Sequence, residues 1–306
     1  MRRAIVTGAD GFLGRHLVHN LEQHGVAVTA LTRRAKPEAS YIAMGDAPWC
    51  PARLATIVET VEPDAIFHLV GGAFGSEAEL EQLNLGVATS VMRALRAVRA
   101  RPLLICCGSA AEYGVAIVDG APISETAVCA PISTYGASKL AQTYAALEFS
   151  EATGTPVLVA RIFNPLGQGM PSYLALGDFA RQIAVLSGRG VLQTGNIHVY
   201  RDFIDVRHVT DALWTLARNP GVRGIVNICS GEATQLSTLV QLLIEVSGKN
   251  VTVQQASARV RPNELAVIVG STARLTSFGA ALPRTDYTDV LSRVWRYAET
   301  QWVATS

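Results

Sequence analysis

The chain has 306 residues, and its 26 Lys and Arg residues nearly balance its 25 Asp and Glu residues. This neutrality excludes the broadly basic surface of a general nucleic-acid binder, and 49% hydrophobic residues beside 17% charged ones exclude intrinsic disorder. The five cysteines include no CxxC pair, so we expect neither disulfides nor a metal site, and a reducing cytoplasm as the location.

Apolar segments alternate with helical patterns along the first half of the chain. Strands are expected at residues 4–7, 26–31, 65–70, 103–107 and 156–161. Helices are expected at residues 12–24, 54–61, 80–99 and 134–152. Because the strands are apolar throughout, helices should cover both faces of the sheet. The prediction is an α/β fold with a doubly wound parallel sheet (Rossmann), whose ligands bind at the carboxyl ends of the strands.

The regular pattern loosens after residue 164. Residues 165–177 are rich in Gly and Pro, and are followed by a helix near 206–218, a strand near 224–229, a helix near 236–247 and a loop with a final helix over 282–302. We predict a nucleotide-binding Rossmann domain over residues 1–165, to which residues 198–228 return. Residues 166–197 and 229–306 are predicted to form a smaller, substrate-binding C-terminal lobe.

The first strand runs directly into a glycine-rich turn with the sequence TGADGFLG. Gly8, Gly11 and Gly14 permit a tight turn, let the backbone approach a pyrophosphate, and let the next helix pack on the strand. Phe12 and Leu13 open that helix. A glycine-rich turn alone is weak evidence, but its place between an N-terminal strand and a helix predicts a dinucleotide site.

The end of the second strand selects the nucleotide. A carboxylate there would bind the ribose 2′-hydroxyl of NAD, but the sequence is Thr32-Arg33-Arg34. Guanidiniums bind phosphate, so NADP with its 2′-phosphate is favoured over NAD, which remains the alternative. Both arginines could also be solvated loop residues. Asp46 is a further candidate, for the adenine amine.

Tyr135 and Lys139 lie four residues apart on a predicted helix, so they share one face a single turn apart. A tyrosine has an ordinary pKa of about 10, and a neighbouring ammonium brings that pKa towards neutrality. The pattern YxxxK arises easily by chance in helices and by itself usually marks surface residues. Here it accompanies Ser109, which follows the fourth predicted strand.

Together, TGADGFLG, Ser109 and YGASK resemble the extended short-chain dehydrogenase/reductase family, in its nucleotide-sugar-modifying branch of the NAD-dependent epimerase/dehydratase type. Further matches follow in the same order: HLVG at 68–71, RIFNPLG at 161–167, RDFIDV at 201–206 and RPNE at 261–264. The resemblance covers nearly the whole chain. It is closest in motif to GDP-4-keto-6-deoxy-mannose reductases and GDP-mannose 4,6-dehydratases.

The resemblance implies roles for individual residues. Tyr135 would be the general acid/base, Lys139 would hold the nicotinamide ribose, and Ser109 would bind the reacting oxygen. Further residues are implied to contact the cofactor: Leu69, Val70, Gly71 and Ile162.

The same resemblance implies a sugar-nucleotide site formed by Asn164, Arg201, Arg261 and Glu264, with the arginines on the diphosphate. Without it, Asn164 could be a turn residue and Arg201 a surface ion-pair partner. We interpret His68 and Asn84 as structural.

Ala110 and Ala111 stand where the resembling dehydratases carry an acid/base pair. An alanine methyl can neither donate nor accept a proton, which disfavours dehydration. Glu112 comes one position later, and on an extended segment it would point the other way. We therefore predict NADPH-dependent reduction of the 4-keto group of a nucleotide-diphosphate 4-keto-6-deoxyhexose, with GDP the favoured nucleotide and Tyr135 the proton donor.

Other functions remain open. The first alternative is an NAD-dependent nucleotide-sugar 4-epimerase, followed by a 4,6-dehydratase and a non-catalytic NADP-binding protein. The resemblance also implies a homodimer through the predicted helices at 80–99 and 134–152. No apolar run approaches the roughly 20 residues that span a bilayer, so we expect no membrane partner and no secretion signal.

Overall fold

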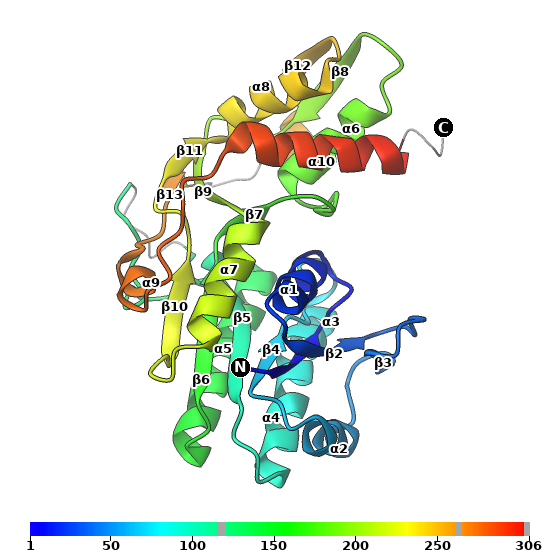
Figure 1. Cartoon of the computed structure of the whole chain (residues 1–306). Coiled ribbons are helices and arrows are strands. Elements are labelled where there is room, and N and C mark those ends of the chain that lie inside the picture. Colours follow the sequence, from blue (N-terminus) through cyan, green and yellow to red (C-terminus); the bar gives the residue numbers. More distant parts are fainter. Residues whose placement is uncertain (115–119, 261–264, 303–306) are drawn as a thin grey trace.

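The computed structural model describes residues 1–114, 120–260 and 265–302, and its largest element is a parallel β-sheet (Figure 1). Seven strands lie in the order β10-β6-β5-β4-β1-β2-β3, and all neighbouring pairs are parallel. Their bounds are β1 Arg3–Thr7, β2 Ala27–Thr32, β3 Tyr41–Ala43, β4 Ala65–His68, β5 Leu103–Ser109, β6 Val157–Ile162 and β10 Gly224–Ile228. The strand order reverses between β1 and β4, which is where doubly wound sheets bind their ligands. The predicted fold class is confirmed.

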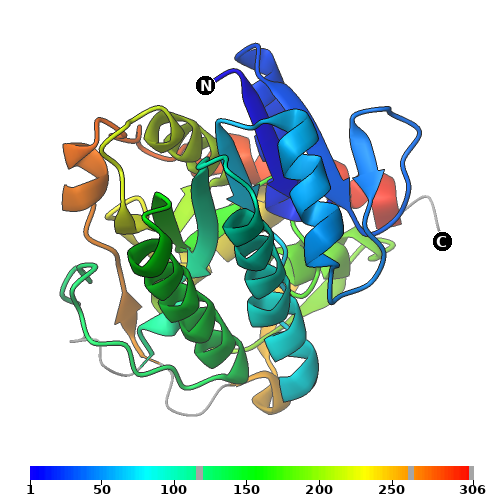
Figure 2. The same ribbon diagram turned by 90° about the horizontal axis from the view of Figure 1, so that it is seen from below.

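Helices cover both faces of this sheet, because successive residues of each strand point to opposite sides. Val6 packs in one core with α1 (Phe12–Gln23) and α7 (Val206–Ala217). Its neighbour Ile5 packs in a second core with α2 (Pro51–Val61), α4 (Val87–Ala97) and α5 (Thr134–Thr153). Figure 2 shows α4 and α5 side by side on this second face. Since both faces are buried, the strands are apolar throughout, which is the pattern that predicted them.

The segment predicted as one helix over residues 80–99 is not a single helix. It consists of α3 (Glu77–Glu81), the π-helical turn η1 (Gln82–Gly86) and α4. Ser76 begins α3 with a capping box, in which its hydroxyl accepts the Glu79 amide and the Glu79 carboxylate accepts the Ser76 amide. The π turn buries Asn84 completely. Such a turn widens the backbone without interrupting the apolar pattern, so periodicity could not reveal it.

A smaller C-terminal lobe lies above the sheet in Figure 1 and has its own apolar core, which includes Phe179, Leu243 and Leu291. It consists of α6 Ala175–Ala184, α8 Leu236–Ser247, α10 Tyr287–Trp302 and the paired strands β8 Gly190–Thr194 and β12 Val251–Gln255. The helix α6 was not predicted, because it follows the Gly- and Pro-rich stretch that suggested a loop.

Short strands join the two lobes. The strand β9 (Tyr200–Asp205) pairs with β7 (Asn164–Leu166), β11 (Ala233–Gln235) and β13 (Val267–Ile268). The remaining elements are α9 Ala273–Ser277 and the 3₁₀ turns η2 Ala110–Glu112 and η3 Ser257–Arg259. Strands of two or three residues carry too few positions for alternation to show, so β3, β7, β11 and β13 were not predicted.

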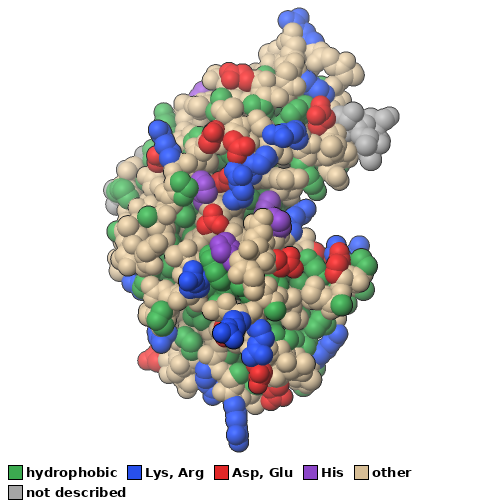
Figure 3. Space-filling model, in the orientation of Figure 1, with side chains coloured by type: hydrophobic (Ala, Val, Ile, Leu, Met, Phe, Trp, Pro, Cys, Tyr) green, Lys and Arg blue, Asp and Glu red, His purple; other side chains and the backbone are tan. Residues whose placement is uncertain are grey.

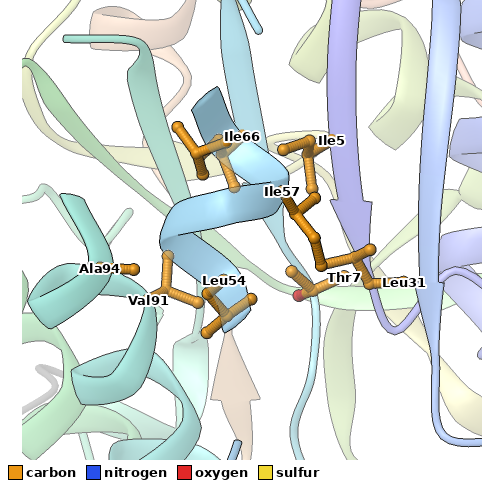
Figure 4. Close-up of a pocket in the computed structure, with 9 residues that line it drawn as sticks. Ile5, Thr7, Leu31, Leu54, Ile57, Ile66, Val91 and Ala94 are labelled. Carbon is orange, nitrogen blue, oxygen red and sulfur yellow. The ribbon is translucent and has the colours of Figure 1, made fainter. Parts of the chain in front are cut away.

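A small cavity lies inside the second core, between the sheet and the helices α2 and α4 (Figure 4). Its lining is apolar except for Thr7, and includes Ile5, Leu54, Ile66 and Val91. With one polar side chain it offers no set of groups that would orient a ligand, so we interpret it as a packing gap. No helix among the described residues is long and apolar enough to cross a membrane.

Candidate active site

The turn between β1 and α1 forms a backbone cradle. Gly8 adopts a φ of 65°, and a side chain there would lie 3.0 Å from the amide nitrogen of Val70. A side chain at Gly14 would overlap the carbonyl oxygen of Gly8. The helix begins at Phe12, so its first amide groups and the positive end of its dipole point out of the turn. This geometry fits the pyrophosphate of a dinucleotide.

The surface is hollowed between the two lobes. Figure 3 shows this hollow at the right edge of the view, between the C-terminal lobe and the part of the molecule that contains the sheet in Figure 1. Carboxyl ends of parallel strands are the binding edge of such folds, so the hollow is the candidate site.

Charged side chains meet beyond the end of β2. Arg33 and Asp46 approach to 4.0 Å, with their side chains 64% and 91% exposed. The buried Thr32 donates its hydroxyl to the Arg34 carbonyl oxygen at 2.7 Å, which fixes the direction of the chain here. An exposed pair at this distance contributes little, so the Arg33 guanidinium is available to an anionic ligand. The two arginines therefore place positive charge directly after the end of β2.

The residues Ser109, Tyr135 and Lys139 come together from β5 and α5. Ser109 is the last residue of β5, and Ser133 caps α5 by accepting the Gly136 amide at 3.0 Å. This cap places Tyr135 in the first turn of the helix, with its phenol close enough to the Ser109 hydroxyl for that hydroxyl to favour the phenolate. Lys139 is buried and donates to the carbonyl oxygen of Cys107 at 2.9 Å.

Burial sets the protonation of the tyrosine and the lysine. Burial raises the pKa of Tyr135 above its ordinary value of 10.0, and the opposing effect of the Ser109 hydroxyl does not cancel this. It also lowers the pKa of Lys139. The Tyr135 phenol therefore holds its proton at neutral pH, which suits a proton donor.

The loop after β4 approaches the lysine closely. The predicted strand over 65–70 ends at His68, so Leu69 and Val70 are loop residues. A side chain on Gly71 would come within 3.0 Å of the Lys139 ammonium nitrogen. Asn84 holds this loop, because its amide group donates to the Gly72 carbonyl oxygen at 2.9 Å and its oxygen accepts the Gly72 amide at 3.0 Å.

His68 is completely buried, and its Nδ1 lies 3.0 Å from the Thr7 hydroxyl. Burial lowers its pKa from 6.5 to about 3. Because the unfolded state binds the proton first, the stability from neutral His68 is complete above pH 6.5 and is lost as the pH falls towards 3. We expect the free energy of unfolding to decrease by about 1.4 kcal/mol per pH unit from this group.

Urea unfolding between pH 7 and pH 5 measures this effect, with His68→Gln beside His24→Gln at an exposed position. The slope should flatten only in His68→Gln. Equal slopes in both variants and the unmodified protein would contradict a buried neutral imidazole.

Two of the predicted sugar-nucleotide residues, Asn164 and Arg201, lie on the short strands that join the two lobes. Asn164 opens β7, and its side-chain amide donates to the Asp202 carbonyl oxygen at 2.9 Å. Arg201 on β9 donates to the Leu265 carbonyl oxygen at 2.9 Å, so its guanidinium is directed at the segment that follows residues 261–264. Arg261 and Glu264 themselves lie outside the described residues. Ile162 ends β6 directly beside Ser109.

The sequence did not indicate an aromatic pair on the surface. Phe74 follows β4 and Tyr173 precedes α6, yet their ring centroids lie 5.3 Å apart. The side chains are 62% and 55% exposed, and a charge on Tyr173 would act on the Tyr135 phenol. Neither residue belongs to a periodic pattern, so their contact arises only from the fold.

The prediction that Glu112 lies on an extended segment is wrong. Residues 110–112 form the 3₁₀ turn η2 and not an extended segment, and the turn carries Glu112 inward. The carboxylate is fully buried and accepts from Arg161 Nε at 2.8 Å. It is thus unavailable as an acid or base in the hollow.

The chain is similar to known enzymes that act on nucleotide sugars. Residues 4–229 match the model of the NAD dependent epimerase/dehydratase family. The chain is 30% identical over 294 residues to GDP-6-deoxy-D-mannose reductase from Pseudomonas aeruginosa, covering 90% of both. It is 30% identical over 253 residues to dTDP-6-deoxy-L-talose 4-dehydrogenase (NAD(P)(+)) from Kitasatospora kifunensis, covering 80% of this chain and 79% of that one.

A solved structure, RMD from Pseudomonas aeruginosa complexed with NADPH, has a TM-score of 0.81 and 26% identity, covering 98% of this chain and all of the other. UDP-glucose 4-epimerase from Brucella ovis, in complex with NAD, has a TM-score of 0.83 at 22% identity, covering 99% and 98%, and shares the fold. The chain belongs to the NAD-dependent epimerase/dehydratase family. It is an NAD(P)-dependent enzyme, and the predicted family and cofactor class are confirmed.

Proposed function

We propose that this enzyme reduces the 4-keto group of a nucleotide-diphosphate 4-keto-6-deoxyhexose with NADPH, and that the nucleotide is GDP. One observation carries the proposal: Tyr135 and Lys139 lie one turn apart on α5 with Ser109 near the Tyr135 phenol, and Ala110 and Ala111 stand in place of a second acid/base pair. The similarity to the Pseudomonas reductase and the Kitasatospora 4-dehydrogenase supports a redox reaction at C4.

The residues divide the work of the reaction. The nicotinamide supplies the hydride when it is bound. The Ser109 hydroxyl hydrogen-bonds the carbonyl oxygen of the sugar, and Tyr135 gives its phenolic proton to the oxygen as negative charge develops there. The nearby Lys139 ammonium stabilises the phenolate that remains, and its contact with Cys107 fixes its position.

The same residues disfavour elimination of water from the sugar. Dehydration requires a base at C5 and an acid at the C6 hydroxyl, and the side chains of Ala110 and Ala111 can serve as neither. Glu112 is the nearest carboxylate in sequence, but it is enclosed with Arg161.

The activity is tested with purified protein, NADPH and a GDP-linked 4-keto-6-deoxyhexose. Consumption of NADPH with formation of the 6-deoxy sugar nucleotide supports the proposal. Interconversion of 4-hydroxy sugar nucleotides on tightly retained NAD, with no NADPH consumption, would instead assign a 4-epimerase.

Arg33 and Arg34, which follow β2, predict that the enzyme prefers NADPH to NADH. Arg33→Ala and Arg34→Ala are expected to raise the KM for NADPH by roughly 10-fold or more, because each removes a charged hydrogen bond to the 2′-phosphate. The KM for NADH should stay unchanged, since NADH lacks that phosphate. Arg99→Ala removes an exposed positive charge just after the end of α4 and serves as the control. Equal effects on both cofactors would show that neither arginine reads the phosphate.

We also infer the wider organisation. Residues 1–165 with 198–228 would bind the cofactor, and residues 166–197 and 229–306 the sugar nucleotide. A homodimer through α4 and α5, in the cytoplasm, agrees with the family resemblance. Light scattering of the purified protein measures the assembly.

A further inference from the structure

A single buried carboxylate joins Ser109 to the helix of Tyr135 and Lys139. Glu112 Oε1 accepts the backbone amide of Ser109 at 2.7 Å. Its other oxygen, Oε2, accepts the hydroxyl of Thr143 at 2.8 Å. Thr143 lies on α5, about two turns beyond Tyr135. Glu112 thus bridges the end of β5 and α5, which between them carry all three residues of the proposed reaction.

Arg161 holds this carboxylate from the third side. It lies on β6, is 2% exposed, and donates Nε to Glu112 Oε2 at 2.8 Å. Its guanidinium also lies over the ring of Tyr113 at 4.6 Å, and the Tyr113 hydroxyl donates to Asn227 on β10 at 2.7 Å. The bridge is therefore anchored to the sheet itself.

The surrounding backbone packs closely on the bridge. A side chain on Gly108 would lie 2.5 Å from Glu112 Oε1. A side chain on Gly136 would lie 2.5 Å from the Ala111 carbonyl oxygen, so the turn η2 rests directly on the first turn of α5. Both glycines permit contacts that any larger residue would push apart.

Stability does not explain why a charged pair occupies this place. Apolar residues of similar volume are often as stabilising as a buried ion pair, because desolvation offsets the attraction between the charges. What apolar residues cannot do is accept the Ser109 amide and the Thr143 hydroxyl at once. A carboxylate at this position therefore connects the Ser109 backbone to the Thr143 side chain through two hydrogen bonds of fixed direction.

We propose that Glu112 is a positioning residue, which holds Ser109 against the helix of Tyr135 so that both hydroxyls meet the same substrate oxygen. The inference rests on the proposed reductase function and adds a residue that does not itself touch the substrate. Small displacements of reacting groups are costly: a shift of about 1 Å can reduce a rate by roughly 100-fold.

The test variant is Thr143→Val, which cuts the tether to α5 while leaving Glu112 paired with Arg161. We expect kcat to fall by about tenfold with the KM for NADPH unchanged, since only the alignment of Ser109 is affected. The matched control is Thr210→Val, because Thr210 is also a buried helical threonine and donates its hydroxyl at 2.8 Å, to Arg207. Both variants should lose the same few degrees of melting temperature.

A double-mutant cycle with Ser109→Ala separates positioning from general damage. If Glu112 acts through Ser109, Thr143→Val costs no further rate in the Ser109→Ala background. Full additivity, or equal kcat losses in Thr143→Val and Thr210→Val, would overturn the proposal.

Crystal structures of the unmodified protein and of Thr143→Val test the positioning role separately from the proposed reaction. Absence of turnover by the unmodified protein would refute the reductase function alone. The Ser109 hydroxyl should still move away from the Tyr135 phenol in Thr143→Val, and an unmoved Ser109 would overturn the positioning role whatever the reaction.

Discussion

Tyr135→Phe is expected to slow reduction of the 4-keto sugar by about 10²- to 10⁴-fold, the usual contribution of a general acid. The substitution removes one hydroxyl and keeps the ring, so the packing of α5 against the sheet should persist. The pKa of Tyr135 lies above its ordinary value because the phenol is buried, so at neutral pH the missing group is a proton donor. Stopped-flow NADPH oxidation measures the rate, and cofactor fluorescence confirms that NADPH still binds.

Tyr144→Phe is the matched control, since Tyr144 lies on the same helix but its side chain is 59% exposed. Its rate and melting temperature should equal those of the unmodified protein. A loss of less than about threefold in Tyr135→Phe would show that another group supplies the proton, because a general acid contributes at least about 100-fold. An NADP-binding protein without catalytic activity would be indifferent to both substitutions.

Arg161→Met is expected to lower the free energy of unfolding by about 3–5 kcal/mol, because it leaves the Glu112 charge buried without a counter-charge. Urea denaturation measures this loss. Arg207→Met provides the comparison, since the Arg207 side chain is 51% exposed and Asp205 keeps its second partner, Arg293. Removing an exposed partner should cost no more than about 1 kcal/mol.

The double variant Arg161→Met with Glu112→Leu distinguishes charge from shape. Replacing both partners by apolar residues should recover most of the stability lost in Arg161→Met, while the rate stays low because the tether to Ser109 is gone. A double variant as unstable as the single one would show that packing of the Arg161 side chain, and not the uncompensated carboxylate, carries the loss.

The glycine-rich turn and the apolar strands were readable in the sequence because their causes are local. Ile5 and Val6 are apolar because helices cover the face of the sheet to which each points. Position 8 requires glycine because its backbone has a positive φ. The four-residue spacing of Tyr135 and Lys139 follows from the helix alone. The family resemblance added the connection between these segments.

Pairs that are distant in sequence were decided by the tertiary structure. Glu112 and Arg161 belong to different strand ends, and nothing local indicates that η2 turns the carboxylate inward. The contact between Phe74 and Tyr173 likewise joins two loops of opposite lobes.

The sequence by itself determined six of the seven strands of the sheet, the glycine-rich turn and the candidate acid, since backbone conformation and side-chain periodicity express them within a few residues. Only the tertiary structure decided that the Glu112 carboxylate binds the backbone amide of Ser109 and is itself held by Arg161 and Thr143. A buried charge takes its partner from whichever element packs against it, and for Glu112 these elements are β6 and α5. Glu112, which the sequence predicted to point away from the site, is the residue that connects β5 to α5.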